Sequence, residues 1–390
     1  MITVDDALTK LFALVDPLPA CMVGLRQAAG RVLAQDVSAR RDQPPFAASA
    51  MDGYAIRSAD YRQGKSLQVV GESAAGHGWD GNLAQGNAIR IFTGAPLPTG
   101  ADHIVIQENV ARDGDRITIT DTTDQGANIR PKGGDFRIGD QIKAPRLLTP
   151  ADIALLAAMN IAQVPVIRKP VVAIIATGDE LVQPGDTPGP DQIIASNSYG
   201  LAALVTAVGC TARLLPIARD TVASLEQAFA LAKDADLIVT IGGASVGDHD
   251  LVGQVAASLG MERSFYKIAM RPGKPLMAGK LGTAAMIGLP GNPVSAMVCG
   301  HVFVLPVLRK MLGLGAAAAG TQIAQLAHDV PANGPRAHYT RARLDAGRVT
   351  IFDRQDSSLL TVLAQANCLA LRPPHDPARK AGDAVQILPL

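Results

Sequence analysis

The alternation of apolar, strand-like runs with helix-like segments between residues 166 and 312 is the strongest constraint on how this chain folds. Short continuous apolar runs occur at 171–176, 214–217, 237–240 and 284–287, and helices are expected at 198–208 and 221–233. Continuous apolar strands that alternate with helices are buried on both faces and joined by crossovers. The pattern therefore predicts a doubly wound α/β sheet, parallel or mixed.

Three loops rich in glycine and proline border the strands of this region, at 242–250, 270–275 and 288–293. Ligands of such sheets bind beyond the carboxyl ends of the strands. Glycines let a bound group approach the backbone, and prolines fix the loop shape. Ser245, Arg271 and Lys274 together with backbone amides predict an anion site. Asp248 and Asp250 are hard oxygen donors for a divalent cation, although either could instead cap the following helix.

A fourth polar segment, Thr177-Gly178-Asp179-Glu180, directly follows the first strand. Its carboxylates predict binding of Mg²⁺ or hydrogen bonding to a nucleotide or pterin. The alternative is a turn whose aspartate caps the next element. The loop at 290–293 opens a helix and predicts anion binding by free amides, or else a purely structural junction.

The rest of the chain divides around this sheet. A helix is expected over 3–36, opening with a capping box at Thr3 and Asp6, and a second helix-rich piece over 149–163. Residues 40–145 contain short β runs and read as an insertion, and 321–390 as a small β domain. The predicted boundaries are 1–38 with 127–165 for a discontinuous helix-rich domain, 39–126 for the β-rich insertion, 166–313 for the sheet domain and 314–390 for a C-terminal β domain.

Composition excludes several classes of protein. The net charge of +1 over 390 residues gives no electrostatic footprint for nucleic acid. The four cysteines lie far apart, so zinc and dithiol motifs are unsupported and free thiols in a reducing compartment are expected. The N-terminus carries no signal-peptide pattern, and the longest apolar run, 294–308, is short for a bilayer. We expect a soluble cytoplasmic protein with no membrane or nucleic-acid partner.

Six motifs in order make the chain recognisable. They are Met51-Asp52-Gly53-Tyr54-Ala55, Thr93-Gly94-Ala95-Pro96, Thr177-Gly178-Asp179-Glu180-Leu181, Gly242-Gly243-Ala244-Ser245-Val246-Gly247, Pro272-Gly273-Lys274-Pro275 and Gly288-Leu289-Pro290-Gly291-Asn292-Pro293. In this order and over essentially the full length, the chain resembles the MoeA family of molybdopterin molybdenumtransferases, which is related to the gephyrin E domain. The resemblance implies four domains, with a sheet domain similar to MogA and a C-terminal β-barrel, in an elongated homodimer. It also implies a site between the sheet domain of one subunit and the insertion of the other.

The resemblance implies the last step of molybdenum cofactor synthesis: molybdate is ligated to the dithiolene of adenylylated molybdopterin, and AMP leaves with the help of a divalent cation, expected to be Mg²⁺. Catalytic positions carried over by motif are Asp52, Thr93, Asp135, Glu180, Asp220 and Asp250, with Glu180 and Asp250 holding the metal. The implied molybdate pocket is Ser245, Arg271, Lys274, Pro275, Arg341 and Ser357. The implied molybdopterin and nucleotide contacts are Thr177, Gly178, Asp179, Gly242, Gly243, Gly247, Lys267, Pro290, Gly291, Asn292 and Pro293. Implied partners are a second copy, a molybdopterin adenylyltransferase that hands over its product, and molybdoenzyme chaperones.

Two other functions remain open at this point. One is a non-catalytic, molybdopterin-binding scaffold like gephyrin, against which the retained acidic residues Asp52, Glu180 and Asp250 argue. The other is a molybdopterin adenylyltransferase or a nicotinamide-nucleotide amidase relative with the same sheet domain. Such proteins would lack the insertion with its Met-Asp-Gly-Tyr turn.

Overall fold

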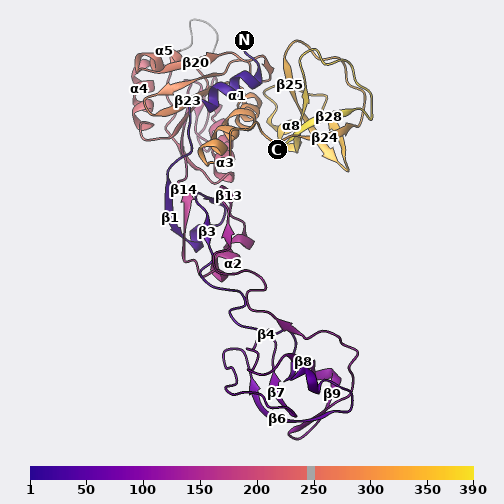
Figure 1. Ribbon diagram of the computed structural model, residues 1–390. Helices are drawn as coiled ribbons and strands as arrows, with labels where there is room; N and C mark the ends of the chain where they lie inside the picture. Colours follow the sequence, from indigo (N-terminus) through magenta and orange to yellow (C-terminus); the bar gives the residue numbers. More distant parts are fainter. Residues whose placement is uncertain (244–250) are drawn as a thin grey trace.

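The computed structural model describes residues 1–243 and 251–390. The molecule is elongated, with a sheet domain and a β-barrel side by side at one end and the insertion at the other (Figure 1). A small four-stranded sheet lies between these two ends. The arrangement separates the predicted site residues into two groups, as described below.

The predicted doubly wound sheet is present and is mixed rather than wholly parallel. Its strand order is β18-β15-β19-β23-β22-β20. The strands are β15 (Val171–Ala176), β18 (Thr211–Leu214), β19 (Leu237–Ile241), β20 (Glu262–Tyr266), β22 (Met277–Leu281) and β23 (Ala284–Leu289). The first three and β23 are parallel, whereas β20 and β22 add an antiparallel edge. The sequence did not predict that edge because β20 carries Glu262 and Arg263 and β22 ends in Lys280-Leu281, so neither reads as a continuous apolar run.

Helices cover both faces of this sheet, and side-chain alternation assigns each strand residue to one face. On β15, Val172 and Ile174 join one buried cluster, while Ala173 and Ile175 join the other. The helices of the first face are α3 (Asn197–Ala207), α6 (Pro293–Cys299) and α7 (Leu305–Met311); those of the second are α4 (Val222–Leu231) and α5 (Leu251–Ser258). The sheet is therefore the middle layer of three.

The prediction of a helix over 3–36 is wrong beyond the first turns. Helix α1 (Val4–Phe12) begins with the predicted capping box at Thr3 and Asp6 but ends at Phe12. The prolines at 17 and 19 prevent its continuation because each lacks a backbone N–H and clashes with the preceding turn. Leu8 and Leu11 are buried in the first core cluster of the sheet domain, against α7 and β20. The N-terminal helix is thus part of that domain's core.

The region expected to be helix-rich is a small sheet with one helix. Its order is β1-β14-β2-β13, from β1 (Ala20–Gly24), β2 (Val32–Leu33), β13 (Arg146–Leu147) and β14 (Gln163–Ile167), and β3 (Val37–Ser38) pairs with β12 (Gln141–Ile142). The helix, α2 (Pro150–Ala158), begins at the predicted Thr149 cap, where Asp152 completes a capping box. It ends at Ala158, and the strand β14, which begins at Gln163, pairs with β1.

The insertion is a six-stranded sheet, with strand order β8-β5-β7-β6-β10-β9. Its strands are β5 (Gly53–Ile56), β6 (Ser66–Ser73), β7 (Asn87–Ile91), β8 (His103–Ile106), β9 (Val110–Asp113) and β10 (Arg116–Ile119). The chain enters and leaves through a short antiparallel pair, β4 (Ala48–Ser49) with β11 (Ile129–Arg130). The predicted β character of 88–92 and 103–106 is confirmed.

The C-terminal β-barrel is also confirmed. Strands β24 (Gln322–Leu326), β25 (Ala337–Asp345), β26 (Arg348–Ile351), β27 (Cys368–Arg372) and β28 (Ala384–Pro389) form a sheet that closes through pairing of β25 with β27. Helix α8 (Leu360–Gln365) contacts α6 of the sheet domain. Strand β21 (Met270–Arg271), from the loop after β20, pairs in parallel with β25 and joins barrel to sheet domain.

The long apolar helix differs from the sequence expectation. Helix α6 continues through a π-helical segment, Gly300–Val304, into α7, so 293–311 is one helix of 19 residues that by length and composition could cross a membrane. Pro306 does not end it because it falls within the first turn of α7, directly after the wider π turn. Of an 18-residue window of this helix, 72% is buried inside the protein, which accounts for its apolar character.

We predict that Leu11→Ala destabilises the sheet domain. Leu11 is 1% exposed within the first core cluster, so its truncation leaves a cavity and lowers the free energy of unfolding by about 2–5 kcal/mol. Urea unfolding measures this loss, and the exposed Lys10→Gln in the same helix is the matched control. Equal midpoints for the two variants would show that α1 is not part of the core.

Candidate functional site

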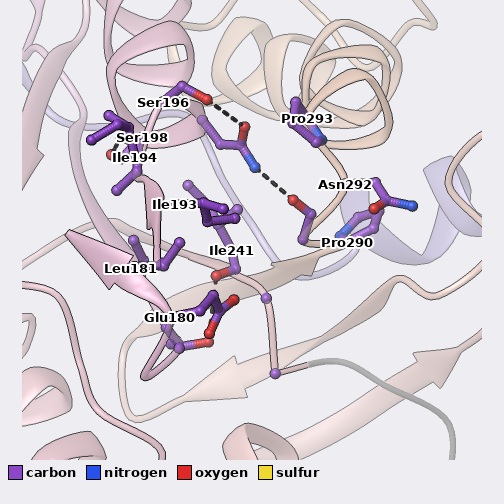
Figure 2. A pocket seen from close by; sticks show the side chains of 18 of the residues that line it. Glu180, Leu181, Ile193, Ile194, Ser196, Ser198, Ile241, Pro290, Asn292 and Pro293 are labelled. Atoms are coloured by element: carbon purple, nitrogen blue, oxygen red, sulfur yellow. Dashed lines mark hydrogen bonds between the residues drawn. The ribbon is translucent and has the colours of Figure 1, made fainter. Parts of the chain in front are cut away.

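The candidate site is a cavity of about 850 Å³ at the carboxyl ends of the parallel strands. The residues after β15, β19 and β23 supply its floor, as the sequence predicted. Figure 2 shows Glu180 and Leu181 on one side, Pro290, Asn292 and Pro293 on the other, and Ile241 between them. The described lining is Ala176, Thr177, Gly178, Glu180, Leu181, Ile193, Ile194, Ala195, Ser196, Asn197, Ser198, Asp220, Ile241, Gly242, Gly243, Leu251, Pro275, Pro290, Gly291, Asn292, Pro293 and Ser358.

The floor requires glycine at positions 242 and 243. Both residues have positive φ, 93° and 63°. A Cβ on Gly242 would lie 2.8 Å from the carbonyl oxygen of Thr177, and one on Gly243 would lie 2.2 Å from Cγ2 of Val252. Thr177 is itself tied to β19, because its N–H donates to the carbonyl of Ile241 at 3.0 Å. Two strand ends thus meet without side chains between them, which leaves the backbone open to a ligand.

The segment that carries Glu180 is fixed from outside the cavity. Gly178 has φ 146°, and a Cβ there would lie 2.3 Å from Oε2 of Glu180, so the carboxylate folds back over the glycine. Arg219 Nη1 donates to the carbonyl oxygens of Asp179 at 2.9 Å and of Leu181 at 3.3 Å. The N–H of Asp220 donates to Asp179 Oδ1 at 3.1 Å. Asp179 is therefore a structural member of this turn, while Glu180 and Asp220 face the cavity.

The proline loop is held from two sides. Asn197 Nδ2, at the first position of α3, donates to the carbonyl of Gly291 at 2.7 Å, and Ser196 Oγ donates to Asn197 Oδ1 at 3.3 Å (Figure 2). From the barrel side, Ser357 Oγ accepts from Asn292 Nδ2 at 3.0 Å, and the Ser357 carbonyl accepts from Val294 N. The loop position therefore depends on both the sheet domain and the barrel.

Sequence reasoning missed part of the cavity wall. Ser196, Asn197 and Ser198 line it, together with Ser358 and an apolar side formed by β16 (Leu181–Val182) and β17 (Ile193–Ile194). The one usable signal was the Ser-Asn-Ser run directly before the expected helix at 198, because polar residues at a helix start lie at the same sheet edge as the loops. The sequence held no comparable signal for the clamp by Arg219.

The predicted residues of the sheet domain are only partly brought together. Thr177, Gly178, Glu180, Asp220, Gly242, Gly243, Pro275, Pro290, Gly291, Asn292 and Pro293 line the cavity. Asp179 lies behind it, and Lys267 lies at the end of β20 with its ammonium 5.1 Å from the ring of Tyr266 and its carbonyl bound to Ile2 N. Ser245, Gly247 and Asp250, with Asp248, lie outside the described residues.

The other predicted anion-binding residues lie where barrel and sheet domain meet. Arg271 on β21 is exposed and stands opposite His338 of β25. Burial and the charges of Arg271, Arg336, Arg341 and Arg372 lower the pKa of His338 to about 4, so it is neutral at pH 7 in a cationic region. Lys274 is exposed next to Pro275, which reaches the cavity.

The Arg341 side chain is buried and hydrogen-bonded within the barrel domain. It is 1% exposed; its Nε donates to Gln355 Oε1 at 3.2 Å and its Nη1 to the carbonyl of Asp356 at 2.8 Å. Desolvation lowers the pKa of its guanidinium. These bonds fix the segment that presents Ser357 to the proline loop and Ser358 to the cavity.

The predicted insertion residues form a second, separate cluster. Thr93 donates both its N–H and its hydroxyl to Asp52 Oδ1, each at 2.7 Å. These two bonds, and then the charge of Arg90, lower the pKa of the exposed Asp52. Asp135 is exposed near the entry to the insertion, with its N–H donating to the carbonyl of Gln43. Within one chain, Asp52, Thr93 and Asp135 are not among the described residues that line the cavity, and the insertion lies at the opposite end of the molecule (Figure 1).

The cavity offers carboxylates to a cation. Glu180 and Asp220 both line it and are exposed, and among the described residues neither forms an ion pair with lysine or arginine. Hard carboxylate oxygens without a protein counter-ion suit Mg²⁺. Among residues 1–243 and 251–390, no three or more His, Cys, Asp or Glu side chains are grouped closely enough to hold a metal ion.

Family models cover nearly the whole chain. Residues 2–160 match the MoeA N-terminal region (domain I and II), 173–310 a probable molybdopterin binding domain, and 324–390 the MoeA C-terminal region (domain IV). Among curated proteins, the chain is 38% identical to a molybdopterin molybdenumtransferase of Nostoc sp., covering 100% of this chain and 94% of that one. It is 32% identical to the enzyme of that name from Staphylococcus aureus, over 99% and 95%.

Solved structures give the same result. A molybdopterin biosynthesis MoeA protein from Pyrococcus horikoshii superposes with a TM-score of 0.85 at 28% identity, over 100% of both chains. A molybdenum cofactor biosynthesis protein from Pyrococcus furiosus, 20% identical with a TM-score of 0.62, shares the fold.

We predict that Gly243→Ala damages the cavity floor. Alanine at positive φ costs about 1–2 kcal/mol, and the new methyl would also displace Val252. Thermal unfolding of Gly243→Ala should show a clear loss of stability. Gly291→Ala is the control for stability, since its Cβ would meet only Gly242 Cα at 3.6 Å. A Gly243→Ala midpoint equal to that of Gly291→Ala would contradict this close approach.

Proposed function

The chain belongs to the MoeA family of molybdopterin molybdenumtransferases, and from this premise we propose that it inserts molybdate into the dithiolene of adenylylated molybdopterin and releases AMP. It is a transferase of molybdenum cofactor biosynthesis. The observation that carries the finer proposal is the cavity itself: the half-buried glycine backbone at 242–243, a fixed proline loop, Glu180 and Asp220 line one space of about 850 Å³.

The cavity suits a phosphorylated heterocycle. Its glycine floor allows the backbone of 242–243 to approach phosphate oxygens, and its apolar side, from Leu181, Ile193 and Ile194, offers a surface to a flat ring. Ser196 and Ser198 add hydroxyl oxygens that can accept hydrogen bonds, since their own protons are donated to Asn197 and Ala195. The volume lies in the range typical of cofactor pockets.

Glu180 and Asp220 would hold Mg²⁺ together with Asp250, which lies outside the described residues. Bound there, Mg²⁺ would neutralise the charge of the phosphates and of the departing AMP. The protein's own part is to position the substrate: Arg219 holds the Glu180 turn, and Asn197 and Ser357 hold the proline loop.

Molybdate is the second substrate, and as a dianion it needs cationic and hydroxyl partners. Arg271 and Lys274 lie on the loop that brings Pro275 into the cavity, and Arg341 fixes the barrel segment with Ser357. We assign molybdate to this junction between sheet domain and barrel. The neutral state of His338 leaves the local charge to the arginines.

The insertion residues would act in a homodimer. Asp52 and Thr93 are bonded to each other and exposed, and the insertion lies at the opposite end of the molecule from the cavity of its own chain, which supports a role at the cavity of a second copy. We therefore propose a site shared between the sheet domain of one subunit and the insertion of the other, in a cytoplasmic protein. We also propose that an adenylyltransferase hands over the substrate and that molybdoenzyme chaperones receive the product.

We predict molybdate-dependent AMP release from adenylylated molybdopterin and Mg²⁺, with active cofactor as product. Glu180→Gln should slow it about 100-fold or more, because the substitution removes an anionic oxygen that would hold the Mg²⁺ needed to neutralise the phosphates. Glu226→Gln, an exposed change on α4, should retain the wild-type rate. Tight binding of substrate without AMP release by the wild-type protein would instead favour a non-catalytic scaffold.

A further inference from the structure

Arg90 is held in the insertion by an unusual set of contacts. It lies on β7, which is flanked by β5 and β6, and β5 begins directly after Asp52. Its guanidinium carbon is 5.1 Å from the ring centroid of Tyr54 and 4.7 Å from that of Phe92. Such cation–π contacts orient the planar group as well as attract it.

Arg90 contacts three segments that surround Asp52, two of them through hydrogen bonds and one through a ring. Its Nη1 donates to the carbonyl of Gly53 at 3.1 Å, and its Nη2 donates to Gln107 Oε1 at 2.7 Å. The N–H of Gln107 in turn donates to the carbonyl of Asp52 at 3.0 Å. Phe92, beneath the guanidinium, directly precedes Thr93, which binds the Asp52 carboxylate.

We propose that Arg90 is a positioning residue for Asp52: it joins the turn at 52–53, the end of β8 and the start of the Thr93 loop into one rigid unit. Its role in turnover rests on the proposed function, in which Asp52 faces the cavity of a second copy. The exposed Asp52 carboxylate is held by Thr93, so its orientation depends on how the turn at 52–53 and the Thr93 loop are fixed relative to each other. The two hydrogen bonds from Thr93 favour the ionised form of the Asp52 carboxylate, and the positive charge of Arg90 favours it further.

The test compares Arg90→Gln, Arg90→Lys and the control Arg112→Gln. Arg112 is an exposed arginine on β9 at the far edge of the same sheet, and its Nε donates to Gly114 within its own turn, so its loss changes the net charge equally without touching Asp52. Two readouts are measured on the full-length protein. One is the titration of the Asp52 carboxyl by carbon NMR with labelled aspartate, assigned by its absence in Asp52→Asn. The other is kcat and KM for AMP release.

Arg90→Gln should raise the Asp52 titration midpoint and lower kcat roughly tenfold to a hundredfold with a smaller change in KM. Arg90→Lys keeps the charge but loses the planar fork, so it should restore most of the titration midpoint and only part of kcat. Arg112→Gln should match the wild type in both.

An Asp52 midpoint and kcat that are unchanged in Arg90→Gln would overturn the proposal. The proposal is also overturned if Arg90→Gln is folded and has a lower kcat but an unchanged Asp52 midpoint, while Arg112→Gln loses as much kcat. That combination would show a general structural effect. If Arg90→Gln unfolds, Arg90→Lys carries the same comparison. A wild type that releases no AMP, with the midpoint still shifted in Arg90→Gln, would refute the proposed function while the positioning of Asp52 stands.

Discussion

The contact on which the cavity depends is the close approach between the ends of β15 and β19. Thr177 and the two glycines at 242 and 243 lie so near that a Cβ at either glycine would enter occupied space. The positive φ values at both positions turn the chain sharply after β19. The proline loop after β23 packs against this turn, since a Cβ placed on Gly291 would lie 3.6 Å from the Cα of Gly242. Backbone therefore forms the floor, and side chains form only the walls.

The walls are held by residues that do not themselves face the ligand space. Arg219 binds the backbone of the Glu180 turn, and Arg341 binds the barrel segment that reaches the proline loop. Arg90 does the same for the Asp52 turn at the other end of the molecule. In each case a guanidinium binds backbone carbonyls or an amide oxygen at fixed geometry, which suits arginine's planar array of donors.

Periodicity predicted the parts of the fold where burial alone decides structure. The runs at 171–176 and 237–240 are apolar on both faces because the sheet is covered twice, and they were found within a residue of their observed ends. The antiparallel edge was missed since β20, at the margin of the sheet, begins with the charged residues Glu262 and Arg263 and has no continuous apolar run. The helix expected over 3–36 failed because a helical pattern in the first turns was extended past Pro17.

The candidate site was predictable where its chemistry lies in contiguous motifs, such as Thr177 to Glu180. Arg90 and Arg219 carried no such signal, because their partners lie far away in sequence: Gly53 is 37 residues from Arg90, and Asp179 is 40 from Arg219. The position of Asp52 relative to the cavity could not follow from the sequence pattern either, since it depends on the length and direction of the link between the two ends.

The central claim is that these two ends form one site across two copies of the chain, and mixed dimers test it most directly. Asp52→Asn and Glu180→Gln proteins, each inactive alone, are unfolded together, refolded at equal amounts and assayed for molybdate-dependent AMP release. A shared site predicts that roughly a quarter of wild-type activity returns, since about half of the dimers are mixed and each has one intact site. No recovery in verified mixed dimers would contradict the account and place both residues in a site within one chain.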